Sequence, residues 1–171
     1  MRFDNAPPFG GLDFFKVIIL GLALIAAQGA VLPWPGGAAP EMAAILVVYV
    51  AWRTEKWMAV LAAFILGLFR DMAGGGLLGL YQVTLILMAW VFHAWRRRFH
   101  LEIPLALMLC VFGLTLGGNI LVLTPLMVLS GWPQAGFDPL PAFLGSSIFS
   151  ALAAPPLFWL LRRLTGGQAH G

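Results

Sequence analysis

Six apolar stretches, separated by short polar or Pro- and Gly-rich connections, dominate the chain. A helix of roughly 20 apolar residues crosses the hydrocarbon core of a membrane, which is about 30 Å thick. The second stretch is short for a crossing, and the fifth is long enough to tilt or to bend at Pro125. The pattern predicts an all-α integral membrane protein, a single six-helix domain over residues 1–171 with transmembrane helices at residues 14–32, 42–52, 57–70, 77–95, 103–129 and 141–161.

Residues that favour helix ends separate these stretches. The cluster from Pro33 to Gly37 ends the first helix. Pro40 suits the start of the second, and Glu41 suits the positive end of its dipole. Residues 53–56 form a tight polar turn, so the second and third helices are predicted to be an antiparallel hairpin. The pair Pro155 and Pro156 within the sixth span is expected to break its regular hydrogen bonding, as either a hinge or a static kink.

Composition excludes a soluble globular domain. Hydrophobic residues make up 61% of the chain and charged residues 10%, whereas soluble domains have about 25% charged residues. With 171 residues, six spans leave no room for a separate soluble domain. Function must therefore reside in the bundle and its short loops.

The positions of the cations predict the topology. With the amino terminus in the cytoplasm, only Arg70 of the ten Lys and Arg residues lies outside, as the positive-inside rule requires. Both termini are then cytoplasmic, and the seven tryptophans fall near span ends as an aromatic belt. The formal charge of +3 therefore reflects topology and not binding of nucleic acid. The cytoplasmic cations are Arg2, Lys16, Arg53, Lys56, Arg96, Arg97, Arg98, Arg162 and Arg163.

No pattern in the chain predicts catalysis. Cys110 is the single cysteine, so neither an intrachain disulfide nor a cysteine-based metal site can form. His93, His100 and His170 are scattered, without the i, i+4 spacing of a helical metal pair. Metalloprotease, serine-hydrolase and paired-aspartate motifs are absent. The sequence predicts a protein that is not an enzyme and needs no metal or cofactor.

Arg70 and Asp71 stand at the outer end of the third predicted span, where ionisable residues are functional candidates. Asp71 either caps the following helix through its exposed N–H groups or forms an interfacial ion pair with an Arg70 that snorkels outward. The glycines at 74–76 and Gly79 permit close packing or positive φ. They lack the Lys-Ser/Thr that follows in a phosphate-binding loop.

Small residues form a stripe on the fifth and sixth predicted helices. Gly113 and Gly117 make a GxxxG pattern followed by Gly118 and Asn119, which allows another helix to approach closely. Packing within the chain is the commoner use of such a stripe, and binding to another protein is the alternative. The candidate residues for this face are Gly113, Gly117, Asn119, Ser146, Ser150 and Pro155.

Three further polar residues lie within spans. Gln28, Gln82 and Thr84, together with Asn119, either line a small-molecule pocket or hold helices together. The second role is the commoner one.

In the middle of the chain, Pro40-Glu41, an apolar helix, a short turn and the segment FILGLFRDMAGGGLLGL occur in order. This order resembles the rod shape-determining protein MreD family. The sequence departs from the family at Arg70, where an apolar residue is common, and near Ser150, where an Asn is common. The family's glycine, aspartate and Leu-Gly block is matched by Gly67, Asp71, Gly74, Gly75, Leu78 and Gly79.

The resemblance implies a non-catalytic, multi-pass component of the bacterial inner membrane. Such a protein binds the bitopic protein MreC and, through it, the MreB filament, RodA and a class B penicillin-binding protein. It contacts membrane lipid and binds no nucleic acid. The family is also similar in fold to the substrate-binding subunits of energy-coupling-factor transporters, so the alternative function is a solute-binding membrane subunit with a pocket open to the outside.

Overall fold

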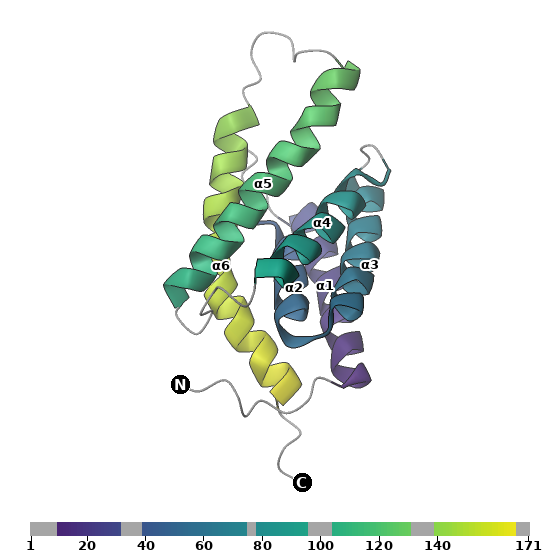
Figure 1. Cartoon of the computed structure of the whole chain (residues 1–171), viewed down its shortest axis with the longest axis vertical. Helices are drawn as coiled ribbons and strands as arrows, with labels where there is room; N and C mark the ends of the chain where they lie inside the picture. The colour runs from purple at the N-terminus through teal and green to yellow at the C-terminus, as the bar shows by residue number, and fades with distance from the viewer. Residues whose placement is uncertain (1–9, 32–38, 75–77, 96–103, 131–138, 167–171) are drawn as a thin grey trace.

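The computed structural model describes residues 10–31, 39–74, 78–95, 104–130 and 139–166, and these residues form six helices (Figure 1). Three of the six, α1, α5 and α6, contain a stretch long and apolar enough to cross a membrane. The described helices are α1 (Gly11–Val31), α2 (Met42–Arg53), α3 (Lys56–Gly74), α4 (Leu80–Trp95), α5 (Pro104–Ser130) and α6 (Pro139–Gly166).

Two helix ends differ from the prediction at the connection between α3 and α4. Helix α3 runs past Asp71 to Gly74, and α4 begins at Leu80 and not at residue 77. Gly79, directly before α4, has a φ of 94°, a left-handed conformation that favours glycine. Gly75 of the predicted motif lies outside the described residues.

The irregularity expected at Pro155 and Pro156 does not end α6. The helix continues through Pro155 and Pro156 to Gly166, and Figure 1 shows that it bends along its length. Prolines bend a helix without ending it when neighbouring helices support the backbone that they distort. Pro155 is half-buried next to the fully buried Ala154. Helix α5 likewise continues through Pro125.

Helix α2 is the centre of the bundle. Its nine consecutive residues from Ala43 to Ala51 are all buried, as expected for a helix that is apolar on every side. At 1.5 Å per residue its 12 residues span about 18 Å, and the other five helices contact it or its direct neighbours. Tyr49 packs edge-on against Phe158 of α6 with ring centroids 5.1 Å apart, and its hydroxyl hydrogen-bonds Thr165 at 2.8 Å.

Helices α3 and α4 form one closely packed pair, and α5 and α6 form another. In Figure 1 the α5–α6 pair extends beyond the ends of α2 and α4. Three glycines allow the closest approaches between helices: Gly21 lies against Leu66, Gly67 against Gln82, and Gly118 against Met88. We use the term distal end for the end of the bundle opposite Gly11 and Gly166, where α1 and α3 end and α2 and α4 begin.

Candidate functional site

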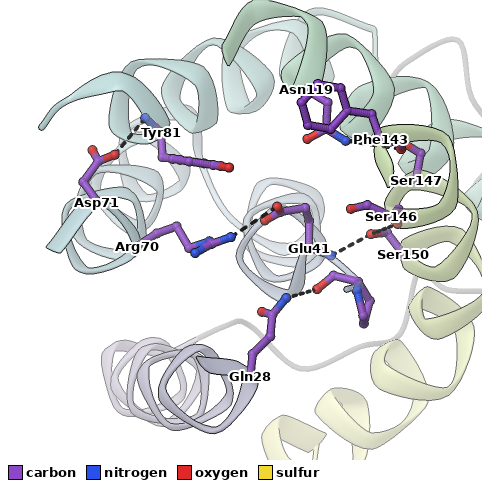
Figure 2. Close-up of polar contacts among 11 residues, drawn as sticks. Gln28, Glu41, Arg70, Asp71, Tyr81, Asn119, Phe143, Ser146, Ser147 and Ser150 are labelled. Carbon is purple, nitrogen blue, oxygen red and sulfur yellow. Dashed lines mark hydrogen bonds and ion pairs between the residues drawn. The ribbon is translucent and has the colours of Figure 1, made fainter. Parts of the chain in front are cut away.

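Polar side chains from five helices and from Glu41, the residue directly before α2, gather toward the distal end (Figure 2). Figure 2 shows Glu41 between Arg70 on one side and the turn of α6 that holds Ser146 and Ser150 on the other. We call this set the distal polar cluster. Its members are Gln28, Glu41, Arg70, Asp71, Tyr81, Asn119, Ser146, Ser147 and Ser150.

Asp71 caps α4. Its carboxylate accepts hydrogen bonds from the backbone N–H groups of Gly79 at 2.9 Å, Tyr81 at 3.0 Å and Gln82 at 3.2 Å. The residue is only 3% exposed. A helix N-terminus offers N–H groups that have no partner within the helix and a positive dipole end, so it stabilises a buried carboxylate. The first of the two interpretations of Asp71 matches these contacts.

Arg70 turns inward and does not snorkel outward. Its Nη2 lies 3.5 Å from Oε1 of Glu41, and the two side chains are 24% and 14% exposed. The guanidinium carbon lies 4.8 Å from the centre of the Tyr81 ring, within the range of a cation–π contact. The ion pair with Asp71, the second of the two interpretations, is not among the described contacts, because α3 directs Arg70 toward the start of α2 and Asp71 toward α4.

The turn at Pro40 and Glu41 connects three helices. Nε2 of Gln28 on α1 donates to the Pro40 carbonyl at 2.6 Å. The backbone N–H of Glu41 donates to Oγ of Ser150 on α6 at 2.7 Å. Ser150 in turn donates to the carbonyl of Ser146 one turn earlier. The start of the central helix α2 is therefore attached to α1 and α6 by hydrogen bonds.

Replacing Ser150 with alanine is expected to lower the free energy of unfolding by about 1–3 kcal/mol, because the N–H of Glu41 then loses its partner in a partly buried position. Thermal unfolding in detergent measures the effect. Thr124→Ala is the control, since Thr124 is exposed and donates to Ile120 of its own helix. Equal melting temperatures for the two variants would contradict this role of Ser150.

No hydrogen bond joins any two of the proposed pocket residues Gln28, Gln82 and Thr84 in the part of the chain that the structure describes. Thr84 donates to the carbonyl of Leu80 in its own helix. The backbone of Gln82 belongs to the Asp71 cap and packs against Gly67. These contacts are of the kind that holds helices together, and a pocket lined by these residues stays a prediction.

The glycine face of α5 is open. Gly113 and Gly117 are exposed, and a Cβ added at either would meet no described atom within 4 Å. The expectation that this pair packs within the chain is therefore wrong for the described residues. The neighbouring Gly118 and Asn119 lie on the packed side, where Gly118 contacts Met88 of α4 and Nδ2 of Asn119 lies 3.5 Å from both Phe143 O and Ser147 Oγ of α6.

A groove of about 240 Å³ lies between α4 and α5 beside Gly113. Its lining is almost entirely apolar. The groove is adjacent to the open glycine face. This surface of α5 therefore allows another helix to approach closely and also leaves space for one of its apolar side chains. The lining residues are Val91, Phe92, Trp95, Leu109, Cys110, Gly113 and Leu114.

Sequence reasoning missed three members of the distal polar cluster as site residues. Glu41 was expected only to favour the dipole of α2, Ser147 was expected only to bond backbone, and Tyr81 was not singled out. Two features of the sequence could have predicted the role of Glu41. It is a carboxylate directly before an apolar stretch, and Arg70 is the one Lys or Arg residue predicted to lie on the outer side of the membrane. An isolated acid and an isolated base in one membrane domain stabilise each other when paired.

The fold and the site define an α-helical membrane protein whose buried ionisable groups serve helix caps and helix-to-helix contacts. Within the described residues no group of three or more His, Cys, Asp or Glu residues could hold a metal ion. The family of the rod shape-determining protein MreD matches residues 12–164, and the chain belongs to this family. Its function lies in the determination of rod shape. No curated protein and no solved structure matches the chain.

Proposed function

We propose that this protein is a non-catalytic, six-span scaffold of the bacterial inner membrane that binds MreC and thereby helps to position peptidoglycan synthesis. Both termini face the cytoplasm in this proposal, and the distal end faces outward. MreB, RodA and a class B penicillin-binding protein associate through MreC. Membership of the MreD family supports this role, and the open glycine face of α5 is the observation that carries the binding site.

The glycine face suits a partner helix because of how helices associate in lipid. Lipid tails are as apolar as the helices, so association depends on close van der Waals packing, which small residues permit. Glycine within a helix costs roughly 0.5–1 kcal/mol relative to alanine. Gly118 offsets that cost by contact with Met88, whereas Gly113 and Gly117 have no such described contact. A transmembrane helix of MreC would supply it.

The groove between α4 and α5 adds a second element to this surface. Exposed Leu109 and Trp95 line it together with Gly113. A helix that crosses Gly117 and Gly113 would pass beside this groove and could place one apolar side chain in it. The proposed MreC site is therefore the exposed side of α5 that carries Gly113 and Gly117, together with the adjacent edge of α4.

Replacing Gly117 with leucine is expected to reduce the amount of co-purified MreC at least about tenfold, since a side chain there separates the two helices and each 1.4 kcal/mol lost is tenfold in affinity. Affinity purification from native membranes in mild detergent measures it. Ala26→Leu is the matched control, because Ala26 is exposed on α1, away from this surface.

Recovery of MreC with Gly117→Leu at the wild-type level would reject this face as the interface. The same purification separates the scaffold from the solute-binding alternative. We expect wild-type protein to retain MreC. Recovery of ATPase subunits and a coupling membrane subunit in place of MreC would overturn the scaffold function itself.

A further inference from the structure

Two hydrogen bonds show how α2 lies along α6. We use the term proximal end for the end of the bundle where α1 begins and α6 ends. Near this end the hydroxyl of Tyr49 pairs with Thr165 of α6, and at the other end of α2 the N–H of Glu41 donates to Ser150. Helix α6 continues past Ser150 to Pro139, which adds about 16 Å at 1.5 Å per residue. That section of α6 therefore extends beyond the start of α2.

The other three helices end or begin close to the same level. Gln28 of α1 donates to the Pro40 carbonyl, and Arg70 of α3 pairs with Glu41. Helices α1 and α3 each end about one turn after these contacts, and Asp71 caps the first turn of α4. Figure 1 accordingly shows α5 and α6 continuing beyond the ends of α3 and α4.

The outward side of α3 is an apolar strip that ends at this level. The strip begins with Trp57 and finishes with Met72, a length of about 22 Å. Lys56, directly before the strip, lies over the ring of Trp90 of α4, 3.2 Å from its centre. Tryptophan and lysine typically mark the boundary between lipid and water. The exposed residues of the strip are Trp57, Met58, Leu61, Phe64, Leu68 and Met72.

A strip of this length is too short for a bilayer of ordinary thickness. The hydrocarbon core is about 30 Å thick. The apolar stretches of α5 and α6 contain 21 and 25 residues, so they are about 32 and 38 Å long. A helix longer than the core can tilt, but a shorter one cannot stretch, and the lipid beside it becomes thinner. Because every exposed side chain of the strip is apolar, lipid is the neighbour that suits it.

We propose that the outward face of α3 and α4 is a lipid-contacting surface that thins the bilayer locally. The phospholipids beside this face lower their head groups to the level of Met72, about 8 Å nearer the membrane centre than beside α5 and α6. The pair of Arg70 and Glu41 then lies near the interface on this side and not deep within hydrocarbon, where charged side chains are costly. The inference requires that α5 and α6 cross the membrane and is independent of MreC binding.

Spin labels at two positions of equal level test this surface. Met72 of α3 and Ile148 of α6 are both exposed, and each lies two residues distal of a residue that contacts Glu41. Each is replaced with cysteine in a Cys110→Ala background, and the labelled protein is reconstituted in vesicles of phosphatidylcholine and phosphatidylglycerol with oleoyl chains. The depth of each label is measured from its collisions with oxygen, which concentrates in hydrocarbon, and with a water-soluble nickel complex.

We expect the Met72 label at the level of the head groups and the Ile148 label in hydrocarbon, about 8 Å deeper. Equal depths, or a shallower label at Ile148, would overturn the local thinning. Leu78→Cys, in the turn before α4, repeats the measurement if Met72→Cys does not fold, since Leu78 is 77% exposed. Labels at Leu61 and Leu160, both exposed nearer the proximal end, are the matched control and should both report hydrocarbon. Water at Leu61 would show that lipid does not cover α3 and would equally reject the surface.

Discussion

Replacing Asp71 with alanine is expected to lower the free energy of unfolding by about 3 kcal/mol or more and to unravel the first turn of α4. Three backbone N–H groups lose their acceptor at once. Each polar group left unpaired in a buried position costs about 1–3 kcal/mol, and bonds to a charged acceptor are the stronger ones. The interaction with the dipole of α4 is lost as well.

Two measurements check this result. Thermal unfolding in detergent, followed by tryptophan fluorescence, reports overall stability. Hydrogen exchange of the amides of Gly79, Tyr81 and Gln82 reports the cap itself and should become faster. Asp71→Asn is the matched control, since one amide oxygen still accepts, and its stability should lie between those of wild type and Asp71→Ala. Wild-type stability with protected amides in Asp71→Ala would show that the carboxylate is not the anchor.

Replacing Gly67 with alanine is expected to prevent α3 and α4 from packing as they do. A Cβ at Gly67 would lie 2.5 Å from the Cα of Gln82 and 3.1 Å from its backbone nitrogen. Backbone atoms cannot rotate away as a side chain can, so the two helices must separate. Overpacking of this kind costs about 1–3 kcal/mol or more, and we expect the upper part of this range, together with poor accumulation in the membrane.

Gly113→Ala is the matched control for Gly67→Ala and should have the opposite effect. Gly113 is also a helical glycine, but no described atom lies within 4 Å of its added Cβ. Alanine there should raise the free energy of unfolding of the isolated protein by roughly 0.5–1 kcal/mol, because alanine loses less backbone conformational entropy than glycine when the helix forms. If alanine lowered the melting temperature by a similar amount at both positions, the assignment of Gly67 as packed and Gly113 as open would be wrong.

These two expected results give the glycine and aspartate motif of the family a common physical meaning. Gly67 and Asp71 are four residues apart on α3 and therefore lie on one face of the helix. Gly67 lets α4 approach, Asp71 fixes the first N–H groups of α4, and Gly79 adopts the positive φ that precedes them. Together these residues of the motif set the distance between α3 and α4 and the residue at which α4 begins.

Local patterns in the sequence predicted this part of the protein well. The apolar stretches predicted the six described helices within a few residues, apart from the later start of α4 and the extension of α3 and α6. The cap by Asp71 was one of two interpretations of a carboxylate before a glycine turn. The glycine and aspartate block indicated the MreD family, which is confirmed. Each of these features depends on residues close together in the chain.

The sequence did not predict how the helices rotate about their axes. Gly113 and Gly117 form the recognisable pattern, yet Gly118 makes the described helix contact and the pair is open. Adjacent positions on a helix differ by about 100° around its axis, which follows from 3.6 residues per turn. Nothing in a helix that is apolar on most sides specifies which of these positions faces a neighbour.

The sequence by itself determined the membrane class, the helices and the family, because hydropathy and short motifs depend on a few neighbouring residues. Only the tertiary structure decided that α2 is the buried centre, that Asp71 caps α4 and that Arg70 pairs with Glu41. Those contacts join residues of different helices. They form only when several helices pack at once, so no single segment specifies them.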